Sequence, residues 1–205
     1  MFFVFEGADG AGKSTQARLL AEHLRRERGL KVLLLREPGG TPLGERIREI
    51  LLDPHSGDLH PATEMFLFMA ARSHLVRRRI LPAIGSGQVV VCDRFLWSTV
   101  VYQGIVGGLG IPEALRAGRI AAPLRPTRIF VIDTPPRAAF RRLGGTDRME
   151  RKGRTFQEKV RQGFLLLARR FPREAAVIDG SGAIGDVHGR ILGRLPRRGW
   201  PESVK

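Results

Sequence analysis

The chain has 205 residues, of which 42% are hydrophobic and 27% are charged. This length and composition suit a single compact domain and exclude disorder over most of the chain. No apolar run reaches the roughly 18 residues that a membrane-spanning helix needs, and the first ten residues lack the basic start of a signal peptide. The one cysteine, Cys92, excludes an internal disulfide. We therefore expect a cytoplasmic protein without a membrane attachment.

The formal net charge of +15 comes from 35 Lys and Arg residues against 20 Asp and Glu residues. An excess of this size is often a sign of nucleic-acid binding. Here the basic residues are spread along the whole chain, and Arg outnumbers Lys by 30 to 5, which indicates a compositional bias. We expect no dedicated nucleic-acid binding, because arginine also recognises phosphorylated small molecules.

In chain order, short apolar runs of strand length alternate with longer segments of helical spacing. Strands are predicted at 2–5, 31–35, 88–92, 128–133 and 175–179. Helices are predicted at 13–28, 42–52, 61–83, 111–122, 135–143, 155–171 and 183–195. This alternation predicts βαβ units, and therefore an α/β fold with a five-stranded parallel sheet and helices on both faces.

The segments between these elements are predicted as loops. The chain after strand 88–92 leads into a loop, and the polar, glycine-rich residues 144–153 form a short lid loop. We expect one domain over residues 1–198, followed by a C-terminal tail at 199–205. In parallel sheets, ligands bind beyond the carboxyl ends of the strands. Residues that follow strands are therefore the first candidates for function.

The segment after the first strand matches the phosphate-binding pattern G-x4-G-K-[ST] and opens a predicted helix, as a P-loop NTPase fold requires. Its glycines let backbone N–H groups approach phosphate oxygens, and the helix N-terminus adds positive charge. We expect the Lys13 ammonium to reach the β- and γ-phosphates and the Ser14 hydroxyl to bind Mg²⁺. The residues expected to bind ATP here are Gly7, Ala8, Asp9, Gly10, Ala11, Gly12, Lys13, Ser14 and Thr15.

Charged residues follow two further strands, at the same edge of the predicted sheet. Arg36 and Glu37 begin the segment REPGGT, where Arg36 can bind two phosphate oxygens. Asp93 and Arg94 follow the third strand, where Asp93 can hold Mg²⁺ and Arg94 can bridge two phosphates. In the lid, Arg148 can close over the transferring group. A triphosphate, a second phosphate site and a closing loop together indicate phosphoryl transfer between two nucleotides.

Six segments of the chain occur in the order and rough spacing of one known family. They are GADGAGKST, REPGGT, FMAAR, CDR, YQG and the DR of the lid. Through these segments the sequence, over about residues 2–195, resembles the thymidylate kinase family of P-loop nucleoside monophosphate kinases. The resemblance implies transfer of the γ-phosphate of ATP to dTMP, giving dTDP and ADP, with Mg²⁺ as cofactor, in the synthesis of dTTP.

The resemblance also implies roles in a dTMP site. Asp9 matches the acid that accepts a hydrogen bond from the sugar 3′-hydroxyl. Phe68 and Arg72, four positions apart on one helix, match the pair that encloses and reads the thymine ring. Tyr102 matches the tyrosine that crowds C2′ and so favours deoxyribose. Ser98 and Gln103 lie in the same predicted loop as Tyr102 and match positions close to the base. The residues expected to bind dTMP are Asp9, Arg36, Glu37, Phe68, Arg72, Arg94, Ser98, Tyr102 and Gln103.

The lid supplies the last set of residues that the resemblance implies. Gly10 directly follows Asp9, as in family members whose lid, rather than the phosphate loop, provides the catalytic arginine. Arg148 and Arg151 are both candidates for this cation, and Arg142 matches a position near the donor nucleotide. With Arg148, the expected catalytic residues are Lys13, Asp93, Arg94 and Arg148, and the expected Mg²⁺ ligands are Ser14 and Asp93.

The predicted helix at 61–83 is apolar on all sides around Phe68. Such a helix must be buried on more than one face. One face suits the substrate pocket, and the other suits a subunit interface, as in the homodimer that the resemblance implies.

Two alternative functions remain open. A kinase for another nucleoside monophosphate or for a deoxynucleoside would not show the selection for dTMP that Arg72 and Tyr102 are expected to give. A nucleic-acid-binding ATPase is suggested by the +15 charge and the basic segment 190–198. It would hydrolyse ATP faster with DNA or RNA, and its binding would depend steeply on salt.

Overall fold

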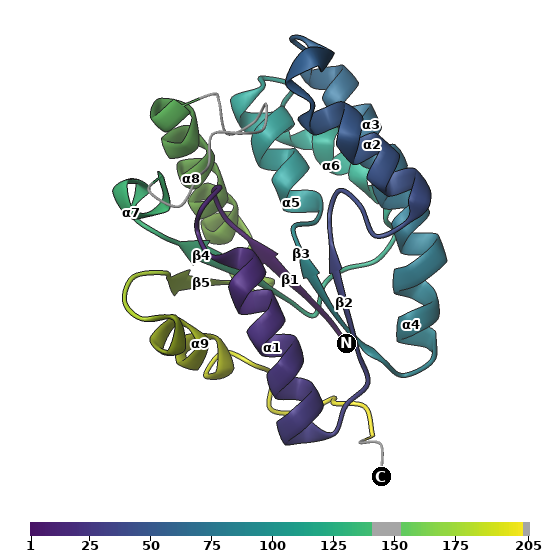
Figure 1. The fold of residues 1–205 in the computed structure, drawn as a ribbon, viewed down its shortest axis with the longest axis vertical. Coiled ribbons are helices and arrows are strands. Elements are labelled where there is room, and N and C mark those ends of the chain that lie inside the picture. Colours follow the sequence, from purple (N-terminus) through teal and green to yellow (C-terminus); the bar gives the residue numbers. More distant parts are fainter. Residues whose placement is uncertain (141–152, 203–205) are drawn as a thin grey trace.

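The computed structural model describes residues 1–140 and 153–202 of the chain. At its centre is a five-stranded sheet in the order β2-β3-β1-β4-β5 (Figure 1). All neighbouring strands are parallel, which confirms the predicted α/β fold. The strands are β1 (Phe2–Glu6), β2 (Val32–Arg36), β3 (Val89–Asp93), β4 (Arg128–Asp133) and β5 (Ala175–Asp179).

Helices connect the strands and lie near most of the predicted ranges. No helix in the two described stretches is long and apolar enough to cross a bilayer. The helices are α1 (Lys13–Arg28), α2 (Pro42–Leu52), α3 (Pro61–Leu75), α4 (Leu81–Gly85), α5 (Leu96–Thr99), α6 (Ile111–Ala121), α7 (Pro136–Phe140), α8 (Gly153–Arg170) and α9 (Ile184–Leu192), with a 3-10 turn η1 (Pro54–Ser56) after α2.

The long helix predicted at 61–83 is present, but its winding changes in the middle. α3 passes into α4 through a π-helical segment, η2 (Val76–Ile80). Pro82 follows directly in the first turn of α4. Proline has no N–H group to donate, and its ring collides with the carbonyl group four residues earlier, so the wider turn before it accommodates the ring.

The segment after β3 is helical, so the loop predicted there is wrong. α5 continues into a second π-helical segment, η3 (Val100–Val106). The local sequence does not mark the start of this helix, because Phe95 at its N-cap makes no side-chain hydrogen bond. The cap comes instead from Glu6 on β1, whose Oε1 accepts hydrogen bonds from the backbone N–H groups of Phe95 (3.0 Å) and Ser98 (3.1 Å).

The helices form a layer on each face of the sheet (Figure 1). α1 and α9 cover one face and bury a cluster that includes Phe3, Phe5 and Phe130. α3, η2, α4, η3, α6 and α8 cover the other face, and α2 packs outside α3. Near the C-terminal end of the described chain, Trp200 packs on Phe3 with ring centres 5.6 Å apart. The Arg28 guanidinium lies 4.2 Å from the centre of the Trp200 ring.

The carboxyl edge of the sheet collects the charged residues that follow the apolar runs. β1 lies in the middle, with β3 on one side and β4 on the other, and such a reversal of strand order opens a crevice at the carboxyl ends. Every strand ends there on a charged residue. These residues are Glu6, Arg36, Asp93, Asp133 and Asp179.

Candidate active site

The phosphate loop lies between β1 and α1, where the motif predicts it. Gly7, Gly10 and Gly12 all have positive φ angles, a region that glycine adopts without steric cost. Gly10 also lies close to the backbone of α7, because a Cβ atom there would be 2.2 Å from the carbonyl oxygen of Ala139. The loop leads directly into Lys13 at the start of α1, so backbone N–H groups and a helix N-terminus converge at one place.

Lys13 lies buried across this loop. Its ammonium group donates a hydrogen bond to the carbonyl oxygen of Ala8 at 2.6 Å. Burial, together with the nearby charge of Arg94, lowers the pKa of Lys13 to about 8, although Asp9 and Asp93 oppose this shift. The ammonium is therefore held next to the cradle, where an anionic phosphate would favour its charged form.

Ser14 and Asp93, the two expected metal ligands, lie in contact at the entrance to α1. The Ser14 hydroxyl donates a hydrogen bond to Oδ2 of Asp93. The other carboxylate oxygen, Oδ1, is buried and has no hydrogen-bond partner among the described residues. No cluster of three or more His, Cys, Asp or Glu side chains suited to a metal occurs in the described part of the chain. One hydroxyl and one carboxylate fit Mg²⁺, which keeps several waters and shares nucleotide phosphates rather than occupying an all-protein cage.

Arg94 connects the phosphate loop to the helix α5–η3. Its guanidinium pairs with the carboxylate of Asp9 and donates from Nη1 to the carbonyl oxygen of Gly7 (3.3 Å) and to Oγ of Ser98 (3.0 Å). The Tyr102 hydroxyl donates to Asp9 at 2.9 Å. Predicted residues from three separate segments therefore form one connected cluster.

Asp9 is held as an anion within this cluster. The amide of Gln157, on α8, donates from Nε2 to Oδ2 of Asp9 at 2.8 Å and accepts from its backbone N–H at 3.2 Å. Burial alone raises the pKa of Asp9. The charges of Arg94 and Lys13, with the hydrogen bonds from Gln157 and Tyr102, lower the pKa to about 2. Asp9 therefore stays an acceptor at neutral pH, as its predicted role requires.

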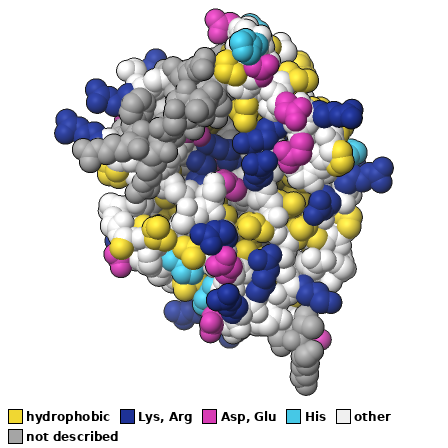
Figure 2. Space-filling model, in the orientation of Figure 1, with side chains coloured by type: hydrophobic (Ala, Val, Ile, Leu, Met, Phe, Trp, Pro, Cys, Tyr) yellow, Lys and Arg dark blue, Asp and Glu magenta, His cyan; other side chains and the backbone are white. Residues whose placement is uncertain are grey.

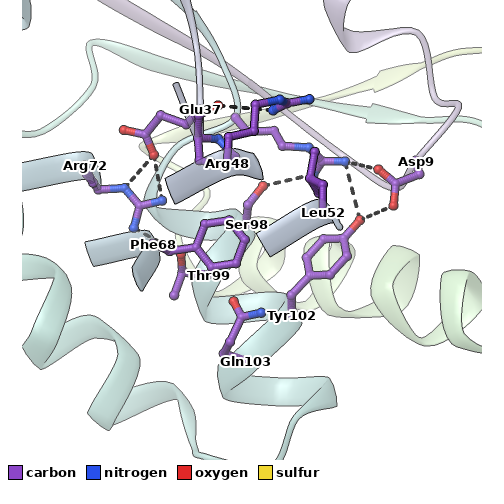
Figure 3. A pocket seen from close by; sticks show the side chains of 12 residues that line it. Asp9, Glu37, Arg48, Leu52, Phe68, Arg72, Ser98, Thr99, Tyr102 and Gln103 are labelled. Carbon is purple, nitrogen blue, oxygen red and sulfur yellow. Dashed lines mark hydrogen bonds and ion pairs between the residues drawn. The ribbon is translucent and has the colours of Figure 1, made fainter. Parts of the chain in front are cut away.

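A pocket opens on the other side of Arg94, between α2, α3 and η3. Figure 3 shows Asp9 and Tyr102 at one end of it and the Glu37–Arg72 pair at the other, with Phe68 and Leu52 between them. The residues that line it are Asp9, Glu37, Pro38, Arg48, Leu52, Phe68, Arg72, Arg94, Ser98, Thr99, Tyr102 and Gln103. It therefore unites all of the predicted dTMP-binding residues except Arg36.

The Arg72 side chain is buried in the wall of this pocket, with only 1% of its surface exposed. Nε donates to Oε2 of Glu37 at 2.7 Å, and Nη2 pairs with the same oxygen and donates to the carbonyl of Phe95. Nη1 donates to Oγ1 of Thr99 at 3.0 Å and to the Met69 sulfur at 3.3 Å. The thioether of Met69 is a weak acceptor, so this is the weakest of the hydrogen bonds that Arg72 makes.

The carboxylate of Glu37 completes this buried pair. Burial raises the pKa of Glu37, and the charge and hydrogen bond of Arg72 oppose the shift. The Oε1 atom of Glu37 is buried without a hydrogen-bond partner among the described residues. Removing either Glu37 or Arg72 would therefore leave the charge of the other buried without an opposite charge beside it.

Arg36 lies outside this pocket. It lines a neighbouring hollow that also contains Ser14 and Asp93, and its Nη2 pairs with Glu45 at 3.2 Å. Glu45 in turn accepts a hydrogen bond from the backbone N–H of Gly40 at 2.8 Å. The structure thus groups Arg36 with the predicted metal ligands rather than with the pocket of Phe68 and Arg72. The predicted lid residues Arg142, Arg148 and Arg151 lie outside the described residues.

Several residues of the site gave no usable signal in the sequence. Arg48 lines the pocket from α2 and donates to the carbonyl of Pro38 at 3.1 Å, but in a chain with 30 arginines its position alone does not single it out. Gln157 lies 148 positions from Asp9, and Glu6 lies 89 positions from Phe95. Contacts over such separations appear only once the sheet is assembled.

A further hollow lies on the donor side of the phosphate loop. It is lined by the loop and by the segment between β5 and α9, including Gly12, Thr15, Gly180 and Gly182. The phosphate loop, this hollow and the pocket beyond Arg94 place two ligand sites at one edge of the sheet, bridged by a guanidinium. A fold and site of this kind define a P-loop kinase, which transfers the γ-phosphoryl group of a nucleoside triphosphate to a second bound ligand and releases the nucleoside diphosphate.

The chain belongs to the thymidylate kinase family, because the family model described as thymidylate kinase matches residues 5–191. The thymidylate kinase of Symbiobacterium thermophilum is 45% identical over 205 residues, which cover 97% of this chain and 95% of that protein. The thymidylate kinase of Caldanaerobacter subterraneus subsp. tengcongensis is 44% identical over 194 residues, 93% of this chain and 92% of that protein. The crystal structure of thymidylate kinase from Ehrlichia chaffeensis superimposes with a TM-score of 0.79 and 31% identity, covering 94% of this chain and 97% of that one. Family membership makes the chain an ATP-dependent kinase of nucleotide biosynthesis.

Proposed function

We propose that the chain transfers the γ-phosphate of ATP to the phosphate of dTMP, giving dTDP and ADP. One observation carries this proposal beyond family membership. Arg94 bonds to Asp9 and Gly7 of the phosphate loop and at the same time lines the pocket of Phe68 and Arg72. A cation in this place lies between a bound donor and a bound acceptor.

Lys13 and Arg94 would stabilise the charge on the moving phosphoryl group. Arg148 of the lid would add a third cation, with Arg151 as the alternative, and Arg142 would lie near the donor nucleotide. Because the acceptor phosphate is itself an anion near neutral pH, the reaction needs no general base. Catalysis then consists of positioning and charge stabilisation.

Ser14 and Asp93 would hold Mg²⁺ with the donor phosphates. When bound, Mg²⁺ neutralises phosphate charge and polarises the transferring group. Oδ1 of Asp93 is buried and has no hydrogen-bond partner in the described part of the chain, which supports this assignment, because a carboxylate oxygen without a donor is otherwise costly to bury.

In the acceptor pocket, Phe68 would stack on the thymine ring and Arg72 would donate to a base carbonyl. Tyr102 would crowd C2′ of the sugar, and Asp9 would accept a hydrogen bond from the 3′-hydroxyl. The remaining proposed contacts to dTMP come from Arg36, Glu37, Arg94, Ser98 and Gln103. All of the residues proposed to contact dTMP except Arg36 line one pocket, which supports these assignments.

A coupled assay with ATP and Mg²⁺ that compares nucleoside monophosphates tests the proposal. We expect dTMP to be the preferred acceptor by a wide margin, because Arg72 and Tyr102 select both base and sugar. Equal turnover of dUMP, CMP or AMP would contradict it. Hydrolysis of ATP stimulated by DNA or RNA would instead favour a nucleic-acid-dependent ATPase. Figure 2 gives this alternative little support, because Asp and Glu side chains lie among the Lys and Arg side chains over the visible face.

We also propose a homodimer that forms through the helix at 61–83. Phe66 on α3 leaves 66% of its surface exposed, whereas its neighbours Met65 and Met69 are buried. A large exposed ring within the apolar stretch 65–69 of this helix supports an interface there. Light scattering should show a dimer, and Phe66→Asp should shift it toward the monomer. A monomeric wild-type protein would contradict the proposed homodimer.

We also propose a cytoplasmic location, which is consistent with the single buried thiol of Cys92.

A further inference from the structure

Glu6 is the last residue of β1 and directly precedes the phosphate loop, but it has no part in the reaction as described so far. Its side chain is fully buried. A buried carboxyl group is costly unless its oxygens accept hydrogen bonds. All three of its hydrogen bonds come from the start of one helix: Oε1 accepts from the backbone N–H groups of Phe95 and Ser98, and Oε2 accepts from the Ser98 hydroxyl at 2.6 Å.

We infer that Glu6 is a positioning residue for Arg94 and acts through the hydroxyl of Ser98. A serine hydroxyl has one proton to donate and two lone pairs that accept. Because Glu6 takes that proton, the Ser98 oxygen must present a lone pair to its other neighbour. That neighbour is Nη1 of Arg94, which donates to Oγ at 3.0 Å. Charge at both ends makes this chain of hydrogen bonds strong and directional.

The backbone at Arg94 also depends on Glu6. Among the described residues, Arg94 is the one non-glycine residue with a positive φ, at 67°, a conformation that persists only where neighbouring contacts hold it. Its N–H donates to the carbonyl of Phe5 at 2.9 Å, and its carbonyl accepts from Sγ of Cys92 at 3.1 Å. The next N–H along the chain, that of Phe95, is bound by Glu6. Glu6 therefore fixes Arg94 from both the side chain and the backbone.

This arrangement ties the two halves of the site together. Glu6 is covalently linked to Gly7, whose carbonyl also accepts from Nη1 of Arg94 at 3.3 Å. The helix that Glu6 caps carries Ser98 and Tyr102 into the acceptor pocket. Loss of the link should misalign the acceptor and Arg94 while leaving the donor cradle intact. Such a loss lowers turnover rather than ATP affinity, because small errors in alignment are costly to the chemical step.

Glu6→Gln and Ser98→Ala test this inference. In Glu6→Gln the amide oxygen can still accept from both backbone N–H groups, but the amide nitrogen cannot accept the Ser98 proton. Glu22→Gln, on the exposed Arg18–Glu22 pair of α1, is the matched control and should behave as wild type. Burial raises the pKa of Glu6 to about 7, although the hydrogen bonds from Ser98 and the charge of Arg94 lower it. Kinetics are therefore measured at pH 8, where the carboxylate is ionised.

We expect each variant to lower kcat with dTMP about tenfold, the loss typical of one charge-assisted hydrogen bond, with the KM for ATP unchanged within about twofold. The double variant Glu6→Gln/Ser98→Ala should be no slower than the slower single variant, because both changes break one chain. Wild-type kcat in either single variant would overturn the inference, and so would losses that multiply in the double variant. A parallel fall of kcat, affinity for both nucleotides and melting temperature would also overturn it, because Glu6 would then be only structural.

The inference rests on the proposed role of Arg94, so Arg94→Ala is measured beside these variants. If Arg94→Ala retains wild-type turnover, the proposed function of Arg94 fails and the role of Glu6 fails with it. If Arg94→Ala is strongly impaired but Glu6→Gln is not, the role of Glu6 alone is wrong.

Discussion

The two halves of the site are built in different ways. The donor half is one contiguous segment, residues 7–14, in which backbone N–H groups and a helix start form the cradle. The acceptor half collects side chains from α2, α3, α5, η3 and the loops after β2 and β3, together with Asp9 of the phosphate loop. A backbone cradle depends on a few glycines, whereas a side-chain pocket depends on how every contributing element packs. Changes near the donor should therefore act on turnover, and changes in the acceptor pocket should act on selectivity and stability together.

The largest effect should come from Arg148, which we propose stabilises the transferring phosphoryl group. Arg148→Ala should lower kcat by about a thousandfold or more, since arginines of this kind stabilise the charge of the transition state. Affinities for ATP and dTMP, measured by calorimetry, should change little. Arg151→Ala is the matched variant and should lose less. The opposite order would assign the role to Arg151, and wild-type turnover in both would remove the lid cation from the mechanism.

In the acceptor pocket, Arg72→Ala should affect selectivity and stability at once. We expect kcat/KM for dTMP to fall about a hundredfold through loss of the hydrogen bonds that we propose Arg72 makes to the base, with the KM for ATP unchanged. The free energy of unfolding should fall by about 3 kcal/mol, because Glu37 is left buried without its partner.

Arg72→Ala/Glu37→Gln separates these two effects. Removing the charge of Glu37 should restore much of the stability without restoring the use of dTMP. Equal losses toward ATP and dTMP in this stabilised double variant would show that Arg72 does not read the acceptor.

The pH dependence of stability tests the link between the two halves. The pKa of Glu6 is about 7 in the folded protein, against an ordinary value of 4.5. As the pH rises from 5 to 8, the unfolded chain loses this proton first, so the folded state loses about 2 kcal/mol of stability through this group. Denaturant unfolding should show a smaller difference between pH 5 and pH 8 for Glu6→Gln. An equal difference in both proteins would mean that Glu6 titrates normally.

The smallest effect should come from Tyr102→Phe, which removes a hydroxyl but keeps the ring. The lost bond to Asp9 should cost about 1 kcal/mol, or roughly fivefold in kcat/KM for dTMP. Because the variant keeps the ring, which we propose lies beside the sugar, the preference for dTMP over its ribose analogue should be retained. Loss of that preference would show that the hydroxyl, not the ring, selects the sugar.

The donor half could be predicted from the sequence because its chemistry is local. The motif at 7–14, the strand before it and the helix after it lie within about thirty residues. Each strand of the sheet also contains an uninterrupted apolar run of a length typical of buried strands. The residue types that follow those strands also placed Asp93 and Arg94 at the correct edge of the sheet.

In the acceptor half, the positions after strands indicated a second phosphate site with Arg36 and Arg94, the other residues were predicted through resemblance to a family, and the geometry was partly missed. The segment that forms α5 and η3 was expected to be a loop. No local residue marks the start of this helix, because its N-cap is supplied by Glu6 from a strand 89 positions away. Arg72 was expected to read a base, but its buried pairing with Glu37 could not be inferred from two residues 35 positions apart. Arg36 was also expected in this pocket. In the structure it pairs with Glu45 and lines a different hollow.

Both ends of the described chain lie at the amino edge of the sheet (Figure 1). Trp200 packs there on Phe3 and beneath Arg28, and the backbone N–H of Val90 donates to the carbonyl of Met1. Nucleotides would bind at the opposite edge. An affinity tag or a surface linkage at the amino terminus would therefore leave the mouth of the catalytic crevice unobstructed, so immobilised enzyme should keep the turnover of enzyme in solution.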